Sequence, residues 1–107
     1  MERWLFLMQR ITAMVLGPLV IIHLVLILFA VKGGLSGAEI LARTTDNYWW
    51  GAFYALFVIA AAVHAPIGIR NILIEWTRLN KSHINLLCTG FAASLLIIGF
   101  RAIAAVI

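Results

Sequence analysis

Charged residues are scarce in this sequence, and acidic residues are the scarcest of them. Only four of the 107 residues are Asp or Glu and eight are Lys or Arg, so charged residues make up 11% of the chain, against about 25% in an ordinary soluble domain. Hydrophobic residues make up 64%, and the mean hydropathy is +1.08. A chain this short cannot bury so much apolar surface in a core of its own. The sequence therefore predicts an integral membrane protein and excludes a soluble domain.

Cysteine is also nearly absent. The single cysteine, Cys88, lies inside an apolar run, which excludes a disulfide framework. The first apolar stretch is longer than the apolar part of a cleavable signal peptide and has no clear small-residue cleavage site, so we expect it to be retained. The net charge of +4 could suggest a nucleic-acid partner. The cations are scattered at the ends of apolar segments, however, where they orient a membrane protein, and we expect no nucleic acid.

Three apolar segments are each long enough to cross a bilayer once as a helix. They are Ile11–Val31 and Tyr48–Ile69, which carry no charge, and Ile84–Ile107, whose one charged residue is Arg101. A hydrocarbon core about 30 Å thick takes roughly 20 helical residues, and three strands could not close a barrel. We therefore expect an all-α fold, a single membrane domain at 1–107 with transmembrane helices at about 11–31, 48–76 and 84–107. Ala38–Ala42 is expected to form a short surface helix.

Positive charges are more numerous on the side of the N terminus. Arg3, Arg10, Arg70, Arg78 and Lys81 lie on that side, against Lys32, Arg43 and Arg101 on the other. By the positive-inside rule, the N terminus and the turn at Thr77–His83 are predicted to face the cytoplasm. Aromatic belts are expected at the two interfaces, formed by Trp4, Trp76, Tyr48, Trp49 and Trp50.

Two histidines lie deep within the predicted spans, where a polar side chain is costly and marks a function or a partner. His23 is roughly 20 Å from the cytoplasmic boundary when measured from Arg10 at 1.5 Å per residue. His64 is roughly 18 Å from the same face when measured from Trp76, or less if Arg70 marks the boundary. Neutral imidazole at this depth is a good axial ligand for haem iron, whereas zinc would need further ligands at helical spacing. The plainer alternative is a hydrogen bond to a Ser or Thr of a neighbouring helix.

Small residues flank both histidines and would let a flat macrocycle approach. Gly68 and Ala60 lie one helical turn on either side of His64, and Gly17 precedes His23. Pro18 and Pro66 are expected to bend their helices. Close packing against another helix is the alternative reading of these small residues.

Arginines near the predicted interfaces form a second set of candidates. Haem propionates and quinone carbonyls both favour a cationic donor, which Arg10, Arg70 and Arg101 could supply; snorkelling to the interface is the alternative. Gly90, Ser94 and Arg101 share one helix face, which we expect to pack inward. A polar and aromatic corner could hold a quinone headgroup or form the surface on which a soluble subunit docks; its members are Arg10, Thr12, Glu75 and Trp76.

Two sequence motifs resemble those of a known family. The run His64-Ala-Pro-Ile-Gly68-Ile-Arg70-Asn-Ile-Leu-Ile-Glu75-Trp76 resembles the second-helix motif of the membrane-anchor cytochrome b subunits of succinate dehydrogenase and fumarate reductase. In that motif a Gly follows the haem-ligating His by four residues and an acidic residue follows it by eleven. Thr12-Ala13, Gly17 and His23 are similar to the first helix of the di-haem branch. The mono-haem branch shows Ser-x-x-His-Arg-x-Ser-Gly, where this chain has Phe6-x-x-Gln9-Arg10-x-Thr12-Ala13. The resemblance covers roughly residues 9–76.

The resemblance implies a function that the residues alone do not. His64 and His23 become axial ligands of two haem b groups, and a second membrane-anchor subunit supplies the remaining ligands of a shared helical bundle. An iron–sulfur subunit and a flavoprotein subunit dock on the cytoplasmic face of a bacterial or archaeal cytoplasmic membrane, and the chain passes electrons to or from quinone without catalysing a reaction itself. The alternatives are a single haem held by His64, and a haem-free small transporter or assembly protein. A transporter would more often carry a carboxylate inside a span, whereas all four acidic residues here lie at the ends of the predicted spans or in loops.

Overall fold

The computed structural model describes residues 3–107, and within that range it contains four helices and no strand. Three of them are long and apolar enough to cross a membrane: α1 (Arg3–Gly33), α3 (Tyr48–Trp76) and α4 (Lys81–Val106). The short helix α2 (Gly37–Thr44) connects α1 to α3. The prediction of an all-α membrane protein with three transmembrane helices is confirmed, as is the short helix in the first connection.

Two helices begin earlier than the sequence predicted. Helix α1 starts at Arg3 rather than near residue 11, and α4 starts at Lys81 rather than at residue 84. The predicted starts were placed where charge ends and hydropathy rises, which locates the lipid boundary. Backbone hydrogen bonds propagate past that boundary once a helix is formed. The start of α4 is fixed by Asn80, whose side-chain oxygen accepts a hydrogen bond from the backbone N–H of Ser82 at 3.0 Å.

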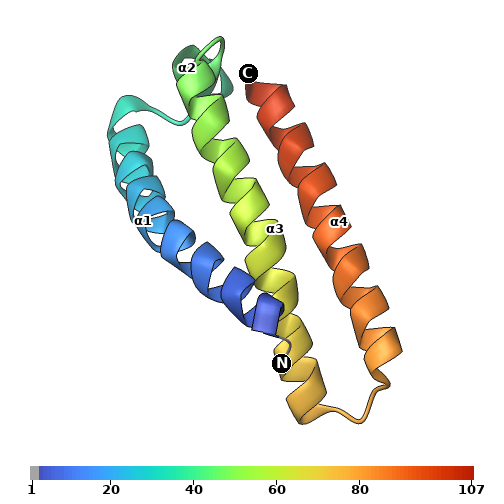
Figure 1. The fold of residues 1–107 in the computed structure, drawn as a ribbon. Coiled ribbons are helices and arrows are strands. Elements are labelled where there is room, and N and C mark those ends of the chain that lie inside the picture. Colours follow the sequence, from blue (N-terminus) through green and yellow to red (C-terminus); the bar gives the residue numbers. More distant parts are fainter. Residues whose placement is uncertain (1–2) are drawn as a thin grey trace.

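Helix α3 is the central element of the bundle. Helix α4 runs antiparallel along it, while α1 crosses it at an angle from the other side (Figure 1). The molecule measures 48 × 23 × 22 Å, an elongated shape suited to crossing a bilayer. Pro18 lies inside α1 and Pro66 inside α3. Each proline removes one helical hydrogen bond, and α1 curves along its length in Figure 1.

Helix α2 closes the end of the bundle that holds the C terminus. Ser36 caps it by accepting a hydrogen bond from the N–H of Glu39 at 3.2 Å, and the Glu39 carboxylate accepts one from the N–H of Ser36 at 3.4 Å. The hydroxyl of Thr44 donates to the carbonyl oxygen of Val106 at 2.8 Å. This bond ties α2 to the last turn of α4, so the first connection is part of the folded bundle.

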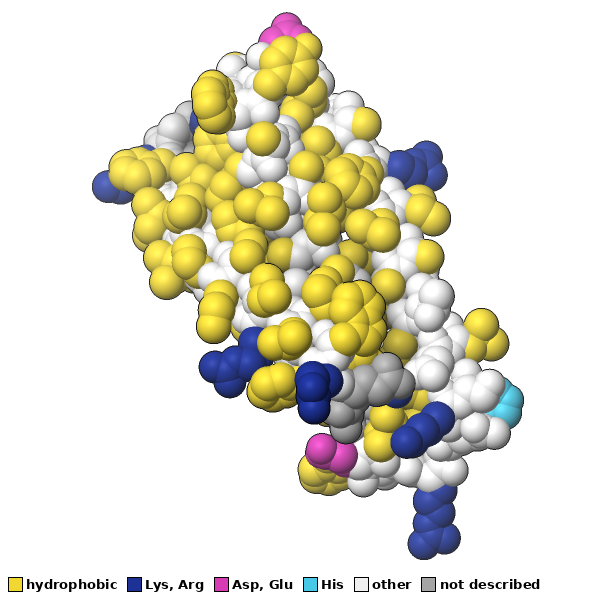
Figure 2. All heavy atoms as spheres, viewed as in Figure 1, with side chains coloured by type: hydrophobic (Ala, Val, Ile, Leu, Met, Phe, Trp, Pro, Cys, Tyr) yellow, Lys and Arg dark blue, Asp and Glu magenta, His cyan; other side chains and the backbone are white. Residues whose placement is uncertain are grey.

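The bundle buries few of its side chains. The total accessible surface is 7622 Å², whereas a soluble globular protein of this mass exposes about 5,900 Å². Hydrophobic side chains cover the face shown in Figure 2, and Lys and Arg gather toward its ends. The buried residues line the contacts of α3 with α1 and α4: Thr12, Leu19, Ala60, Ala62, Pro66, Ile67, Ile84 and Cys88. The exposed apolar surface must therefore be covered by lipid or by other subunits.

Candidate functional site

His64 faces α1, and one of its ring nitrogens has a partner there. Its Nδ1 lies 3.3 Å from the hydroxyl oxygen of Thr12. Thr12 is 6% exposed and is the one polar residue in the buried set of the described chain. No described residue bonds to the other ring nitrogen, Nε2, and the side chain is half-buried. The ring is thus held at one nitrogen and open at the other.

Gln9 and Gly68 lie one turn from this pair, on the same contact between α1 and α3. A β-carbon placed on Gly68 would lie 3.4 Å from the Gln9 Nε2 atom, so the glycine face that the sequence assigned to a macrocycle is in contact with Gln9. The Oε1 atom of Gln9 is buried without a hydrogen-bond partner. Gln9 precedes the first predicted span, and its position opposite Gly68 depends on how α1 and α3 align.

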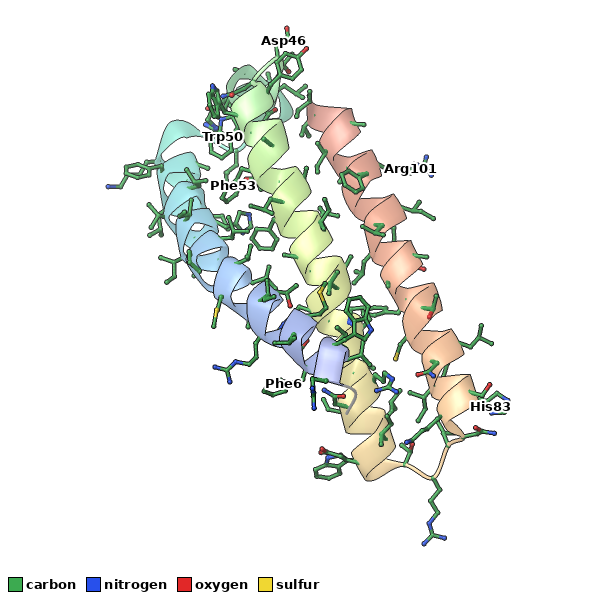
Figure 3. The ribbon with its side chains drawn as sticks, viewed as in Figure 1. Phe6, Asp46, Trp50, Phe53, His83 and Arg101 are labelled. Carbon is green, nitrogen blue, oxygen red and sulfur yellow. The ribbon has the colours of Figure 1, made fainter. Side chains whose placement is uncertain are left out.

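His23 sits in an aromatic environment at a different level of the bundle. Its ring meets Tyr54 edge-on, with ring centroids 5.8 Å apart, and Phe57 at 5.5 Å. Trp50 stacks on Tyr54 at 5.8 Å, and Phe53 also packs against Tyr54. Trp50 and Phe53 lie between α3 and α1 in Figure 3. These contacts fix the plane of the His23 ring without a hydrogen bond from any described residue.

The two histidines are well separated along the bundle. On α3, the residues opposite His23 precede His64 by seven to ten positions, or roughly 10–15 Å. The sequence gave His23 and His64 nearly equal depths because the depth of His64 was measured from Trp76, and α3 extends well past the start of α1 (Figure 1). Measuring the depth of His64 from Arg70 comes closer to the structure. His23 lies farther than His64 from the end of the bundle where α1 begins, as the sequence suggested.

Gly17, six residues before His23 on α1, lies on an exposed part of the helix. A β-carbon built on Gly17 would meet nothing within 4 Å, and both Gly17 and Pro18 are exposed. This part of α1 therefore carries no packing partner within the chain. The approach of a flat macrocycle at Gly17 stays a prediction of the sequence.

The three candidate arginines have different surroundings. Arg70 donates from Nε to the side-chain oxygen of Asn85 on α4 at 2.8 Å. Arg10 lies over the ring of Phe6, 5.7 Å from its centroid, on the exposed side of α1. Arg101 is exposed and points away from α3 in Figure 3.

The predicted inward face of the third span is exposed in the chain. Gly90 and Ser94 are both exposed, and a β-carbon on Gly90 would meet nothing within 4 Å. The predicted inward packing of this face is therefore not made within the chain, and a companion subunit would have to provide it. Helix α4 instead turns Ile84 and Cys88 toward α3, because these apolar side chains fill that contact.

The polar and aromatic corner predicted for a quinone is not assembled as one site. Thr12 is buried beside His64, whereas Arg10 is exposed on another side of α1. Glu75 and Trp76 are exposed at the end of α3, where Trp76 has 82% of its surface accessible. They lie eleven and twelve residues beyond His64, or roughly 16–18 Å along the helix.

Two grooves lie beside the bundle axis. One, of about 410 Å³, runs between α3 and α4 and is lined by Leu5, Pro66, Arg70, Asn85, Cys88 and Thr89 among others. The other, of about 360 Å³, lies under α2 and includes Arg43, Trp50 and Tyr54. Arg43 donates to the carbonyl oxygen of Gly34 at 2.7 Å at its edge. Residues 3–107 contain no group of three or more His, Cys, Asp or Glu that could hold a bare metal ion.

These features define the class: a three-span helical membrane protein whose apolar surface needs lipid or companion subunits, with two histidines at membrane depth. The chain matches the family described as "Succinate dehydrogenase/Fumarate reductase transmembrane subunit" over residues 1–100. It therefore belongs to this family of membrane subunits. Neither a curated protein nor a solved structure matches it.

Proposed function

We propose that this membrane subunit binds haem b and passes electrons between an iron–sulfur subunit and membrane quinone. Family membership supports its role as a transmembrane subunit of a succinate dehydrogenase or fumarate reductase complex. The oxidation of succinate or the reduction of fumarate would take place in a flavoprotein subunit, and this chain would catalyse neither. The main observation in favour of haem binding is the hydrogen bonding of His64: its Nδ1 contacts the Thr12 hydroxyl, and no described residue bonds to its Nε2.

The residues on the α1 and α3 faces fit haem b. An axial ligand must be a neutral imidazole with one nitrogen free, and its other nitrogen is generally held by a hydrogen bond. In His64, Nδ1 lies 3.3 Å from the Thr12 hydroxyl oxygen, and no described residue bonds to Nε2. His23 has a ring fixed by Tyr54 and Phe57 and no hydrogen bond from a described residue, and Gly17 leaves space on the same helix. When bound at these residues, haem b would supply one-electron transfer through its iron.

The separation of the two histidines supports two haem sites rather than one. The levels of His23 and His64 differ by roughly 10–15 Å along α3, which favours a separate haem at each histidine. Each would need a second histidine from a companion anchor subunit. We therefore propose two haem b groups shared between two anchor subunits.

The charged groups are assigned to the edges of these sites. Arg70 and Arg101 would bind anionic propionates, as Arg-carboxylate pairs do. Quinone is proposed to bind at the end of the bundle that carries Arg10, Glu75 and Trp76, which are exposed there. The same end holds the larger share of Lys and Arg, which supports a cytoplasmic orientation and the docking of the soluble subunits on that side.

The decisive experiment is a reduced-minus-oxidised spectrum of the complex purified in mild detergent, expressed as haem per flavin. His64→Asn keeps an amide group near the Nδ1 position but cannot bind iron, and His23→Phe keeps the aromatic packing with Tyr54 and Phe57. Each substitution is expected to remove one of two haems. His83→Ala is the control, because His83 is exposed in the first turn of α4 (Figure 3).

Other outcomes have definite meanings. One haem per flavin that His23→Phe leaves unchanged would reject the second site and leave His64 as the single ligand. A complex with flavin but no b-type absorbance would reject haem binding altogether. Purification without any flavoprotein or iron–sulfur partner would favour a small transporter or an assembly protein.

A further inference from the structure

Thr12 places a buried hydroxyl group inside a membrane helix. It is 6% exposed, and a buried hydroxyl costs free energy unless it is hydrogen-bonded. It lies on the face of α1 that packs against α3, directly beside His64. The sequence suggested that Thr12 contacts a quinone headgroup, but its hydroxyl already has its partners within the chain.

Those partners determine the direction of the bond to His64. The Thr12 hydroxyl donates to the carbonyl oxygen of Met8 at 2.7 Å, with the carbonyl oxygen of Gln9 at 3.1 Å as a second acceptor. A hydroxyl has one proton to donate. Once that proton is directed at the α1 backbone, the Thr12 oxygen can only accept from His64 Nδ1, 3.3 Å away. In a neutral His64 ring, this arrangement places the proton on Nδ1 and the lone pair on Nε2.

We propose that Thr12 is a positioning residue, which sets the tautomer and ring orientation of His64 so that Nε2 can bind iron. This inference rests on the proposed haem function. A hydrogen bond from the outer nitrogen of a ligating histidine fixes the ring and makes it a stronger electron donor. Thr12 supplies that bond from a different helix, so the packing of α1 on α3 is coupled to the iron ligand. No other described residue is bonded to the His64 ring.

The test uses the intact complex with variants at Thr12. Thr12→Val removes the hydroxyl at nearly constant volume, Thr12→Ala removes it without adding bulk, and Thr12→Ser restores it. Ser94→Ala is the matched control, because the Ser94 hydroxyl donates to a carbonyl four residues back, as Thr12 does, but contacts no histidine. The readouts are the midpoint potential of the His64 haem, its low-spin ferric EPR signal and the rate of haem loss after dilution in detergent.

Loss of the hydroxyl is expected to raise the midpoint potential, because a weaker donor stabilises the ferric state less. It should also shift the EPR signal and accelerate haem loss by about 10-fold or more. Thr12→Ser and Ser94→Ala should behave like the unmodified complex. Unchanged potential and EPR signal in both Thr12→Val and Thr12→Ala would overturn the positioning role while leaving haem binding intact. If the unmodified complex contains no haem, the proposed function and this inference both fail.

Discussion

Gly99 of α4 faces Val58 of α3 so closely that no β-carbon fits between them. A β-carbon built on Gly99 would lie 2.5 Å from Cγ1 and 2.8 Å from Cγ2 of Val58. Valine is branched at its β-carbon and its side chain has little freedom to turn away. The distance between α3 and α4 at this level therefore depends on a glycine.

Substitution at Gly99 should weaken the pairing of α3 with α4. Gly99→Ala is expected to lower the free energy of unfolding by about 1–3 kcal/mol, the usual cost of overpacking, as measured by unfolding in detergent or bicelles. Gly90→Ala lies on the same helix, where a β-carbon would meet nothing within 4 Å, and should leave the chain's own packing unchanged. Equal effects of the two substitutions would show that Val58 yields without cost.

Gly17 is expected to matter only when the complex is assembled. The chain places no atom within 4 Å of a β-carbon at this position, so Gly17→Leu should not disturb the chain's own fold. If haem or a companion helix approaches there, the added side chain should reduce haem retention or recovery of the companion subunit at least several-fold. Ile22→Leu, which changes an exposed apolar residue on the same helix without adding bulk, serves as the control. If Gly17→Leu keeps its full haem content, then haem and the companion helix do not approach the chain at Gly17.

The capping box of α2 should make that helix sensitive to acid. Hydrogen bonds from the side chain and backbone of Ser36, with a smaller contribution from Arg43, lower the pKa of Glu39 from its ordinary value of 4.5. Because the folded-state pKa is the lower one, the stabilisation is fully present above about pH 4.5 and is lost as the pH falls through the depressed value. The protection factors of the α2 amides, which correct for the intrinsic pH dependence of exchange, should fall over that range, and Glu39→Gln should remove this change.

The same helix allows a direct test of its cap. Ser36→Ala should destabilise α2 by about 1 kcal/mol, seen as faster amide exchange confined to residues 37–44. Helices α1 and α3 should keep their protection, because the cap contacts neither span. A loss of protection throughout the bundle would mean instead that α2 supports the fold of the whole chain.

Arg70 and Asn85 should be energetically coupled. The bond from Arg70 Nε to the Asn85 side-chain oxygen is 2.8 Å and joins α3 to α4 beside the turn. A double-mutant cycle with Arg70→Gln and Asn85→Ala is expected to give a coupling energy of about 0.5–1.5 kcal/mol. Pairing Arg78→Gln with Asn85→Ala should give no coupling, since no bond joins those residues. A coupling energy near zero in the first cycle would mean that the Arg70 bond is replaced by water or lipid headgroups.

The sequence predicted the spans well, because lipid imposes a strong constraint on hydropathy. It placed the three helices, the short helix between the first two and the depth order of His23 and His64. It placed the start of α1 too late, because Arg10 marks where lipid begins and not where the helix begins. The same reasoning delayed the start of α4, which Asn80 caps in the polar turn.

The sequence alone did not predict the contacts between helices, because they depend on how one helix aligns against the next. The adjacency of Thr12 and His64, and that of Gln9 and Gly68, arise from the alignment of α1 on α3. The sequence analysis took Gly90, Ser94 and Arg101 as the inward face of α4 because small and polar residues share that side. Within the chain that side is exposed, and the larger apolar side chains of Ile84 and Cys88 are buried instead.

Cys88 gives the molecule a built-in reporter of its own assembly. It is 7% exposed, the sole thiol of the chain, and it lines the groove between α3 and α4. Because Cys88 is almost fully covered in the folded chain, a membrane-permeant alkylating reagent should reach this sulfur faster before α4 docks on α3 than afterwards. The time at which newly made chains become resistant to the reagent therefore dates the closure of that hairpin, with no engineered label required.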